Sequence, residues 1–119
     1  MLKKTITLFA ILISLAGCAT SPKMAVAPNQ TVTKPSAQES QIIFMRSSFV
    51  GSAIDASLFD VTNGNMEFIG IISNATKIAH VTKPGKHTFM VVSEAADFME
   101  ADVLPGKNYY SIVTPRMGA

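Results

Sequence analysis

From Gln41 onward the sequence predicts an all-β fold, a small antiparallel β-sandwich of about seven strands. Short runs rich in β-branched and aromatic residues are separated by Gly, Pro and Asn, which favour turns. Several runs alternate, so that Ile54, Ala56 and Leu58 share one face of a strand. At most one helical turn is expected, at 93–97. The expected strands are 41–46, 53–60, 66–73, 77–82, 87–94, 98–104 and 108–114.

Three turn signals divide these strands. The pair Asn63-Gly64 tolerates positive φ at both residues, which predicts a type I′ hairpin across 53–73. In Pro84-Gly85 and Pro105-Gly106 the Pro fixes φ and the Gly that follows tolerates positive φ. Each pair is followed by Lys. We interpret both as hairpin corners of one sheet system.

The first 17 residues predict an export signal. Lys3 and Lys4 form a basic start, and the apolar run 5–16 is too short to cross a bilayer as a permanent helix. The run carries no amphipathic stripe that would pack it against a domain. We therefore assign 1–17 as a signal peptide.

The signal ends in a stretch that resembles the bacterial lipobox: Leu15, Ala16, Gly17 and Cys18. Small residues let the backbone enter a peptidase, and the thiol of Cys18 is nucleophilic enough to accept a lipid. The resemblance implies that Cys18 becomes the lipidated first residue, with a diacylglyceryl thioether and an N-acyl chain such as palmitate. The alternative is an ordinary cleaved signal that happens to contain a Cys.

Residues 18–40 predict a flexible linker that joins the lipid anchor to a domain at 41–119. The linker contains Pro22, Pro28 and Pro35 and no aromatic residue, so it buries too little apolar surface to fold alone. Ala follows the Cys, whereas an Asp there resembles an inner-membrane retention signal. We expect anchoring in the outer membrane, with the domain on the periplasmic face.

Composition argues against nucleic acid as a partner. The chain has 10 basic and 8 acidic residues, and loss of Lys3 and Lys4 with the signal makes the mature chain formally neutral. Phosphate binding needs a basic patch. The only cysteine is Cys18, so the domain has no thiol for a disulfide or a metal.

The sequence does not predict an enzyme or a cofactor other than the covalent lipid on Cys18. His80 and His87 flank the Pro84-Gly85 turn, either as a metal clip across a hairpin or, as we favour, as two partly buried or surface imidazoles. No Cys, third His or acidic pair at ligand spacing completes a tetrahedral metal site. The carboxylates are scattered, and no nucleophile, base and orienting group are recognisable together.

Three residues form a candidate binding surface. Arg46 precedes a polar connection, where it either grips an anion or stays solvated. Tyr109 and Tyr110 either form an exposed anchor or divide between core and sheet edge, because adjacent strand residues point to opposite faces. The acidic stretch 94–102 is either a rim for a cationic partner or a solvated strand face.

Several motifs resemble the small bacterial lipoprotein domains of the DUF2846 family, with some likeness to PEGA-type sandwiches. They are the Phe-x-Arg opening at Phe44, the Phe-Ile-Gly-x-Ile strand from Phe68, the Pro-Gly-Lys-His turn and the closing Gly-Lys-x-Tyr-Tyr. The resemblance covers about 42–118 and implies a β-sandwich without catalytic residues in the envelope of a Gram-negative bacterium. Such domains usually continue beyond the Tyr-Tyr strand, so one further strand is expected to be missing here.

We therefore expect a non-enzymatic envelope lipoprotein whose tethered β-domain binds another envelope protein or a polymer. The alternative is a structural or inhibitory accessory subunit of an envelope complex.

Overall fold

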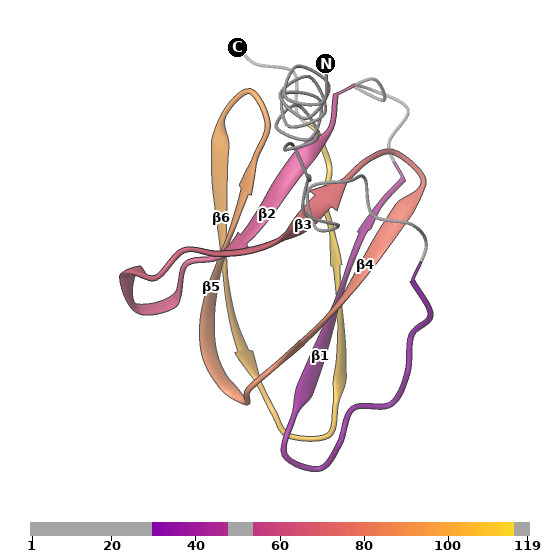
Figure 1. Ribbon diagram of the computed structural model, residues 1–119, viewed down its shortest axis with the longest axis vertical. Coiled ribbons are helices and arrows are strands. Elements are labelled where there is room, and N and C mark those ends of the chain that lie inside the picture. The colour runs from indigo at the N-terminus through magenta and orange to yellow at the C-terminus, as the bar shows by residue number, and fades with distance from the viewer. Residues whose placement is uncertain (1–29, 48–53, 116–119) are drawn as a thin grey trace, which may run out of the picture.

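A computed structural model describes residues 30–47 and 54–115 of the chain. Two β-sheets pack face to face (Figure 1), which confirms the predicted sandwich. The described residues hold one short 3-10 turn, η2 (Thr62–Gly64), and no helix long and apolar enough to cross a membrane. The predicted signal peptide and Cys18 lie outside them. The seven strands are β1 (Ser40–Arg46), β2 (Ala56–Asp60), β3 (Glu67–Ile72), β4 (Thr76–Thr82), β5 (Gly85–Val92), β6 (Ala96–Val103) and β7 (Asn108–Ile112).

The strands are divided into a three-stranded sheet, β4-β1-β7, and a four-stranded sheet, β3-β2-β5-β6. Their pairings are antiparallel except that β7 runs parallel to β1. The exception arises because both strands start at the same end of the sandwich. There the Gly106 N–H donates to the Glu39 carbonyl at 2.7 Å, and the Gln41 N–H donates to the Lys107 carbonyl at 3.0 Å.

Both Pro-Gly turns have the predicted backbone, with positive φ at Gly85 and Gly106. Our interpretation of them as hairpin corners was wrong. The first joins β4 to β5 and the second joins β6 to β7, and each connection crosses from one sheet to the other. The strands on either side of each corner therefore face each other across the core instead of pairing edge to edge.

The predicted hairpin across 53–73 is confirmed as β2 and β3. Asn63 and Gly64 have φ of 56° and 77°, and the Asn65 N–H donates to the Thr62 carbonyl at 3.2 Å. Pairing resumes only at Asp60 and Glu67, so the loop is longer than a two-residue turn. The helical turn expected at 93–97 is absent, because a tight turn there joins β5 directly to β6.

The core lies between the sheets and combines apolar residues from both. Phe44 of β1 meets Phe89 of β5 edge to face, with ring centroids 5.3 Å apart. Ala56 and Leu58 point inward as the alternation predicts, whereas Ile54 lies before β2 and is exposed. Met99, Ala101 and Val103 occupy alternate positions of β6 and all lie against the core.

The last part of the predicted linker packs against the domain. The Gln30 N–H donates to the Lys77 carbonyl at 3.4 Å, and the Gln30 side-chain oxygen accepts from the Ala79 N–H at 2.9 Å. These contacts lie on the outer edge of β4, and Figure 1 shows the segment starting near this strand and descending to the start of β1. From residue 30 onward the linker is part of the folded unit.

Replacing the corner glycines tests the two crossings separately. Gly106 has φ of 70°, in the left-handed helical region, and Gly106→Ala should cost about 1 kcal/mol of unfolding free energy. Gly85 has φ of 125°, which side-chain-bearing residues avoid, so Gly85→Ala should cost more, toward the top of a range of roughly 1–3 kcal/mol. An added Cβ meets nothing closer than 3.9 Å at either site, so a loss seen in chemical denaturation does not come from a steric clash. Equal losses of unfolding free energy for Gly85→Ala and Gly106→Ala would contradict this difference in backbone strain.

Candidate functional site

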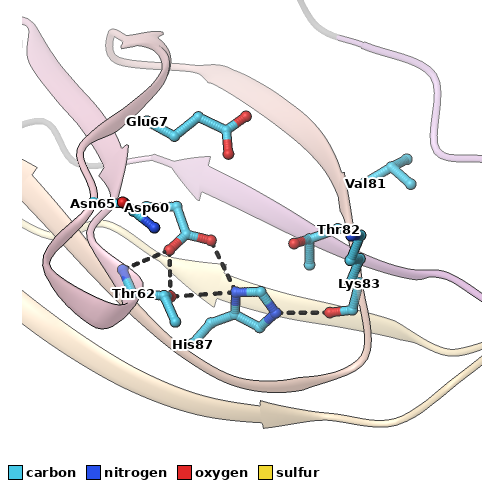
Figure 2. Close-up of a pocket in the computed structure, with 8 residues that line it drawn as sticks. All are labelled: Asp60, Thr62, Asn65, Glu67, Val81, Thr82, Lys83 and His87. Atoms are coloured by element: carbon cyan, nitrogen blue, oxygen red, sulfur yellow. Dashed lines mark hydrogen bonds and ion pairs between the residues drawn. The ribbon is translucent and has the colours of Figure 1, made fainter.

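A polar pocket of about 450 Å³ lies where the β2–β3 loop approaches the β4–β5 corner. Figure 2 shows side chains from both sheets gathered around it. The pocket is lined by Asp60, Thr62, Asn65, Glu67, Val81, Thr82, Lys83 and His87.

Asp60 ends β2 on the inward face and is only 6% exposed. Its Oδ1 accepts from the Thr62 N–H at 3.0 Å and from the Thr62 hydroxyl. The Thr62 hydroxyl oxygen in turn accepts from the Thr88 N–H at 3.0 Å. This local loop, in which an Asp side chain bonds the backbone two residues ahead, starts the turn that joins β2 to β3.

His87 bridges the two turns (Figure 2). Its Nδ1 lies 2.8 Å from Asp60 Oδ2, and its Nε2 lies 2.7 Å from the Lys83 carbonyl oxygen. A carboxylate and a carbonyl can only accept, so each of these contacts needs an N–H on the ring nitrogen that faces it. The ring stacks on Phe89, with centroids 5.7 Å apart and planes 17° apart.

The pKa of the Asp60 carboxyl lies below its ordinary value. Burial raises the pKa, but the hydrogen bonds from the Thr62 hydroxyl and backbone N–H lower it, as do the hydrogen bond and charge of His87. The hydrogen bonds and the nearby charge together outweigh the desolvation. Asp60 is therefore a stably ionised group that accepts hydrogen bonds from Thr62 in the β2–β3 loop and from His87 in β5.

The arrangement does not have the geometry of a catalytic triad. In a triad one imidazole nitrogen binds the carboxylate and the other is left to take a proton from a nucleophile. Here the second nitrogen is bound to the Lys83 carbonyl, and Thr62 is held between Asp60 and the Thr88 N–H. The groups satisfy one another, so the pocket locks the β2–β3 loop to the β4–β5 corner.

The metal clip that we considered for the two histidines is not assembled. His80 of β4 contacts Phe89 edge to face at 6.2 Å, and His87 stacks on the same ring with both nitrogens engaged. Within 30–47 and 54–115, no group of three His, Cys, Asp or Glu side chains could hold a metal ion.

The three residues of the predicted binding surface do not lie together at the surface. Arg46 is 3% exposed at the end of β1, so it does not present a solvated guanidinium. Tyr109 packs against the core, and its hydroxyl accepts from the Leu104 N–H at 2.8 Å. Tyr110 is 63% exposed, as expected because neighbouring strand residues point to opposite faces.

A different surface emerges from the strand register. On the outer face of the four-stranded sheet, Phe68 pairs with Phe59, Phe59 with Met90, and Met90 with Phe98. We call these four residues the apolar row. Phe59 and Phe68 contact each other at 5.3 Å, and Phe98 at the open end is 64% exposed. Each residue occupies an outward position of its strand, but only the pairing shows that the four align.

Acidic residues border the apolar row along β6. Glu100 and Asp102 follow Phe98 at alternate positions, so all three side chains share the outer face. Opposite them on β5 lie Thr88 and Lys86. Most of the acidic stretch 94–102 is exposed. The row therefore ends in an exposed aromatic ring beside negative charge.

Comparison of the chain with protein-family models, curated proteins and solved structures finds no match. The resemblance to the DUF2846 family stays a prediction.

The role of Asp60 can be measured through the pH dependence of stability. Asp60→Asn should lower the unfolding free energy near neutral pH by about 1–3 kcal/mol, because it removes a charged acceptor from a buried network. The pKa of Asp60 in the folded state lies below its unfolded value of about 3.9. The contribution of the Asp60 carboxylate to the unfolding free energy is therefore complete above that pH and is lost as the pH falls through the folded-state pKa. The difference in unfolding free energy between the unsubstituted chain and Asp60→Asn, measured by denaturation at pH 7 and at successively lower pH values, should shrink in acid.

Asp55→Asn is the matched control, since Asp55 is exposed just before β2. A pH profile for Asp60→Asn that equals the control profile would exclude the proposed network.

Proposed function

We propose that this chain is a lipid-anchored protein of the bacterial outer membrane whose β-sandwich, on the periplasmic face, binds another envelope protein without catalysing a reaction. The apolar row carries this proposal. Phe59, Phe68 and Met90 are partly exposed and Phe98 is exposed, and contiguous apolar surface that a folded domain leaves accessible marks interaction sites. Phe98, which is largely exposed, offers a rigid aromatic anchor of the kind enriched at binding hot spots.

The chemistry of the apolar row favours a protein over a polysaccharide as partner. Three Phe and one Met offer no hydrogen-bonding group, apart from the weakly accepting thioether, while protein interfaces are enriched in aromatic residues and Met. The carboxylates of Glu100 and Asp102 add a negative border. The expected partner therefore presents an apolar surface flanked by Lys or Arg, and charge complementarity sets its orientation.

The polar pocket supports a role without catalysis. Asp60, Thr62 and His87 bind one another and two backbone groups, so a substrate would have to displace existing hydrogen bonds. Joining the β2–β3 loop to the β4–β5 corner is sufficient to explain why these side chains are arranged in this way.

The lipid anchor predicts the fate of one variant. Cys18→Ala removes the thiol to which the lipid would be attached, so the chain should accumulate as a longer, unlipidated precursor. Intact-mass measurement on membrane fractions would show both the retained signal and the absent acyl chains. Normal maturation of Cys18→Ala would refute lipidation at this position.

The apolar row is tested by crosslinking in cells. A photoreactive phenylalanine at position 90 should capture one envelope protein, and adding Phe98→Ser should reduce that capture about tenfold, as expected for loss of a hot-spot aromatic residue. Phe98 is mostly exposed, so its loss should change stability by no more than about 0.5 kcal/mol. Glu100→Lys should also weaken capture through charge reversal.

Leu104→Ser is the control, because Leu104 is an exposed apolar residue after β6 that lies outside the row. Capture of peptidoglycan, or capture that is unchanged by Phe98→Ser, would argue against a protein partner at this face.

A further inference from the structure

Each sheet has two edges, and three of these four edges are protected within the described residues. Gln30 covers β4 through its backbone and side chain. β3 has an extra residue, Ile69, opposite the Leu58–Phe59 step of β2, and β6 carries acidic side chains along its length. Bulges and charges of this kind prevent edge-to-edge pairing.

β7 differs from these edges, although the Asn108 side chain at its start donates to the Thr33 carbonyl at 3.3 Å. It forms the outer strand of the three-stranded sheet, and its sequence, Asn-Tyr-Tyr-Ser-Ile, contains no charge and no Pro. Tyr110 and Ile112 lie on its outer face, 63% and 66% exposed. An uncharged, regular edge with exposed β-forming side chains is a template for another strand.

The hydrogen bonds at the two ends of β7 show which backbone groups face the open edge. The Lys107 carbonyl accepts from the Gln41 N–H at 3.0 Å, and the Val113 N–H donates to the Met45 carbonyl at 2.7 Å. The backbone groups of residues 107 and 113 therefore point toward β1. Because this direction alternates along a strand, the N–H and C=O groups of the odd-numbered residues between them also point toward β1. The N–H and C=O groups of Asn108, Tyr110 and Ile112 point away from β1.

We propose that β7 pairs antiparallel with β7 of a second copy of this chain, about a two-fold axis at Tyr110. Tyr110 then exchanges both backbone hydrogen bonds with its counterpart, and Asn108 pairs with Ile112 of the other copy. Every N–H and C=O that β7 directs outward meets a complementary group. The result is one continuous sheet through both copies, an interaction that goes beyond the proposed function and leaves the apolar row free.

β7 can pair with a second copy of itself without a change of register along the strand. An interface with two-fold symmetry requires the same patch to fit itself, and the outward groups of β7 are symmetric about Tyr110. The strand carries no charge, so the two copies meet without repulsion. Tyr110 also lies diagonal to Ile112 of the other copy on the same face, and aromatic and β-branched side chains stabilise such cross-strand contacts.

Cysteine substitutions in the full-length chain, made in cells, test the pairing and its register. Residues that form a hydrogen-bonded antiparallel pair have Cα atoms about 5.5 Å apart, which suits a disulfide. Tyr110→Cys should therefore give a disulfide-linked dimer on non-reducing gels. Ile112→Cys alone should not, because the two copies of residue 112 lie roughly 14 Å apart in this register. Asn108→Cys and Ile112→Cys expressed together should crosslink to each other.

The unsubstituted chain is the control for Cys18, its only cysteine. A disulfide formed by Ile112→Cys alone would overturn the register. If Tyr110→Cys links only to another protein, a heterologous strand occupies the edge and the second-copy proposal fails.

Charge variants test the contact without new disulfides. Two differently tagged full-length copies should co-purify from the same cells, and Tyr110→Lys in both should abolish this because the two charges would meet at the axis. Tyr110→Lys paired with Tyr110→Glu should restore it, which a folding defect would not allow. Phe98→Ser should leave co-purification unchanged, so failure here is separable from failure of the proposed function. Absence of co-purification for the unsubstituted chain would refute the dimer.

Discussion

The two sheets depend on one contact region, the ring of Phe89. Phe44 meets it edge to face from the opposite sheet, His80 approaches it from β4, and His87 stacks on it along β5. Truncation of a buried Phe to Ala typically costs about 3–5 kcal/mol, and an aromatic pair adds about 0.5–1.5 kcal/mol beyond its buried area. In a small domain of marginal stability, such a residue decides whether the sandwich closes.

The polar pocket connects the contacts around Phe89 to the neighbouring loops. His87 is held flat on Phe89 while it binds Asp60 and the Lys83 carbonyl, so one imidazole joins the core to the β2–β3 loop and to the corner where the chain changes sheet. Such charge-assisted hydrogen bonds are stronger than neutral ones and fix geometry. The most recognisable polar cluster in the described residues thus serves the fold, and function is better sought on surfaces that the fold leaves open.

Those surfaces follow from the architecture. A two-layer sandwich uses the inner face of each sheet for its core, and it leaves two outer faces and four edges. Here the outer face of the four-stranded sheet carries the apolar row, and among the described residues β7 is an edge strand of the other sheet. Because the two surfaces belong to different sheets, a partner on one does not obstruct a second copy on the other.

Local pattern was enough to predict much of this molecule. The alternation of Ala56 with Leu58, the glycine turns and the composition after residue 40 predicted seven strands and their inward residues, because strand periodicity and turn conformation depend on adjacent residues. Pairing depends on contacts between distant segments, which local pattern does not encode. Only the tertiary structure decided that the Pro-Gly corners cross between sheets and that β7 runs parallel to β1.

The candidate site shows the same division. The sequence singled out Tyr109 and Tyr110, and alternation placed them on opposite faces, but it did not show that Arg46 is buried or that His87 binds Asp60. The apolar row needed the register of four strands, since its members are separated along the chain and are ordinary outward residues in each strand. By itself the sequence determined the strands, turns and the export-signal pattern; the tertiary structure decided which residues meet, because burial and pairing are properties of the assembled sheets.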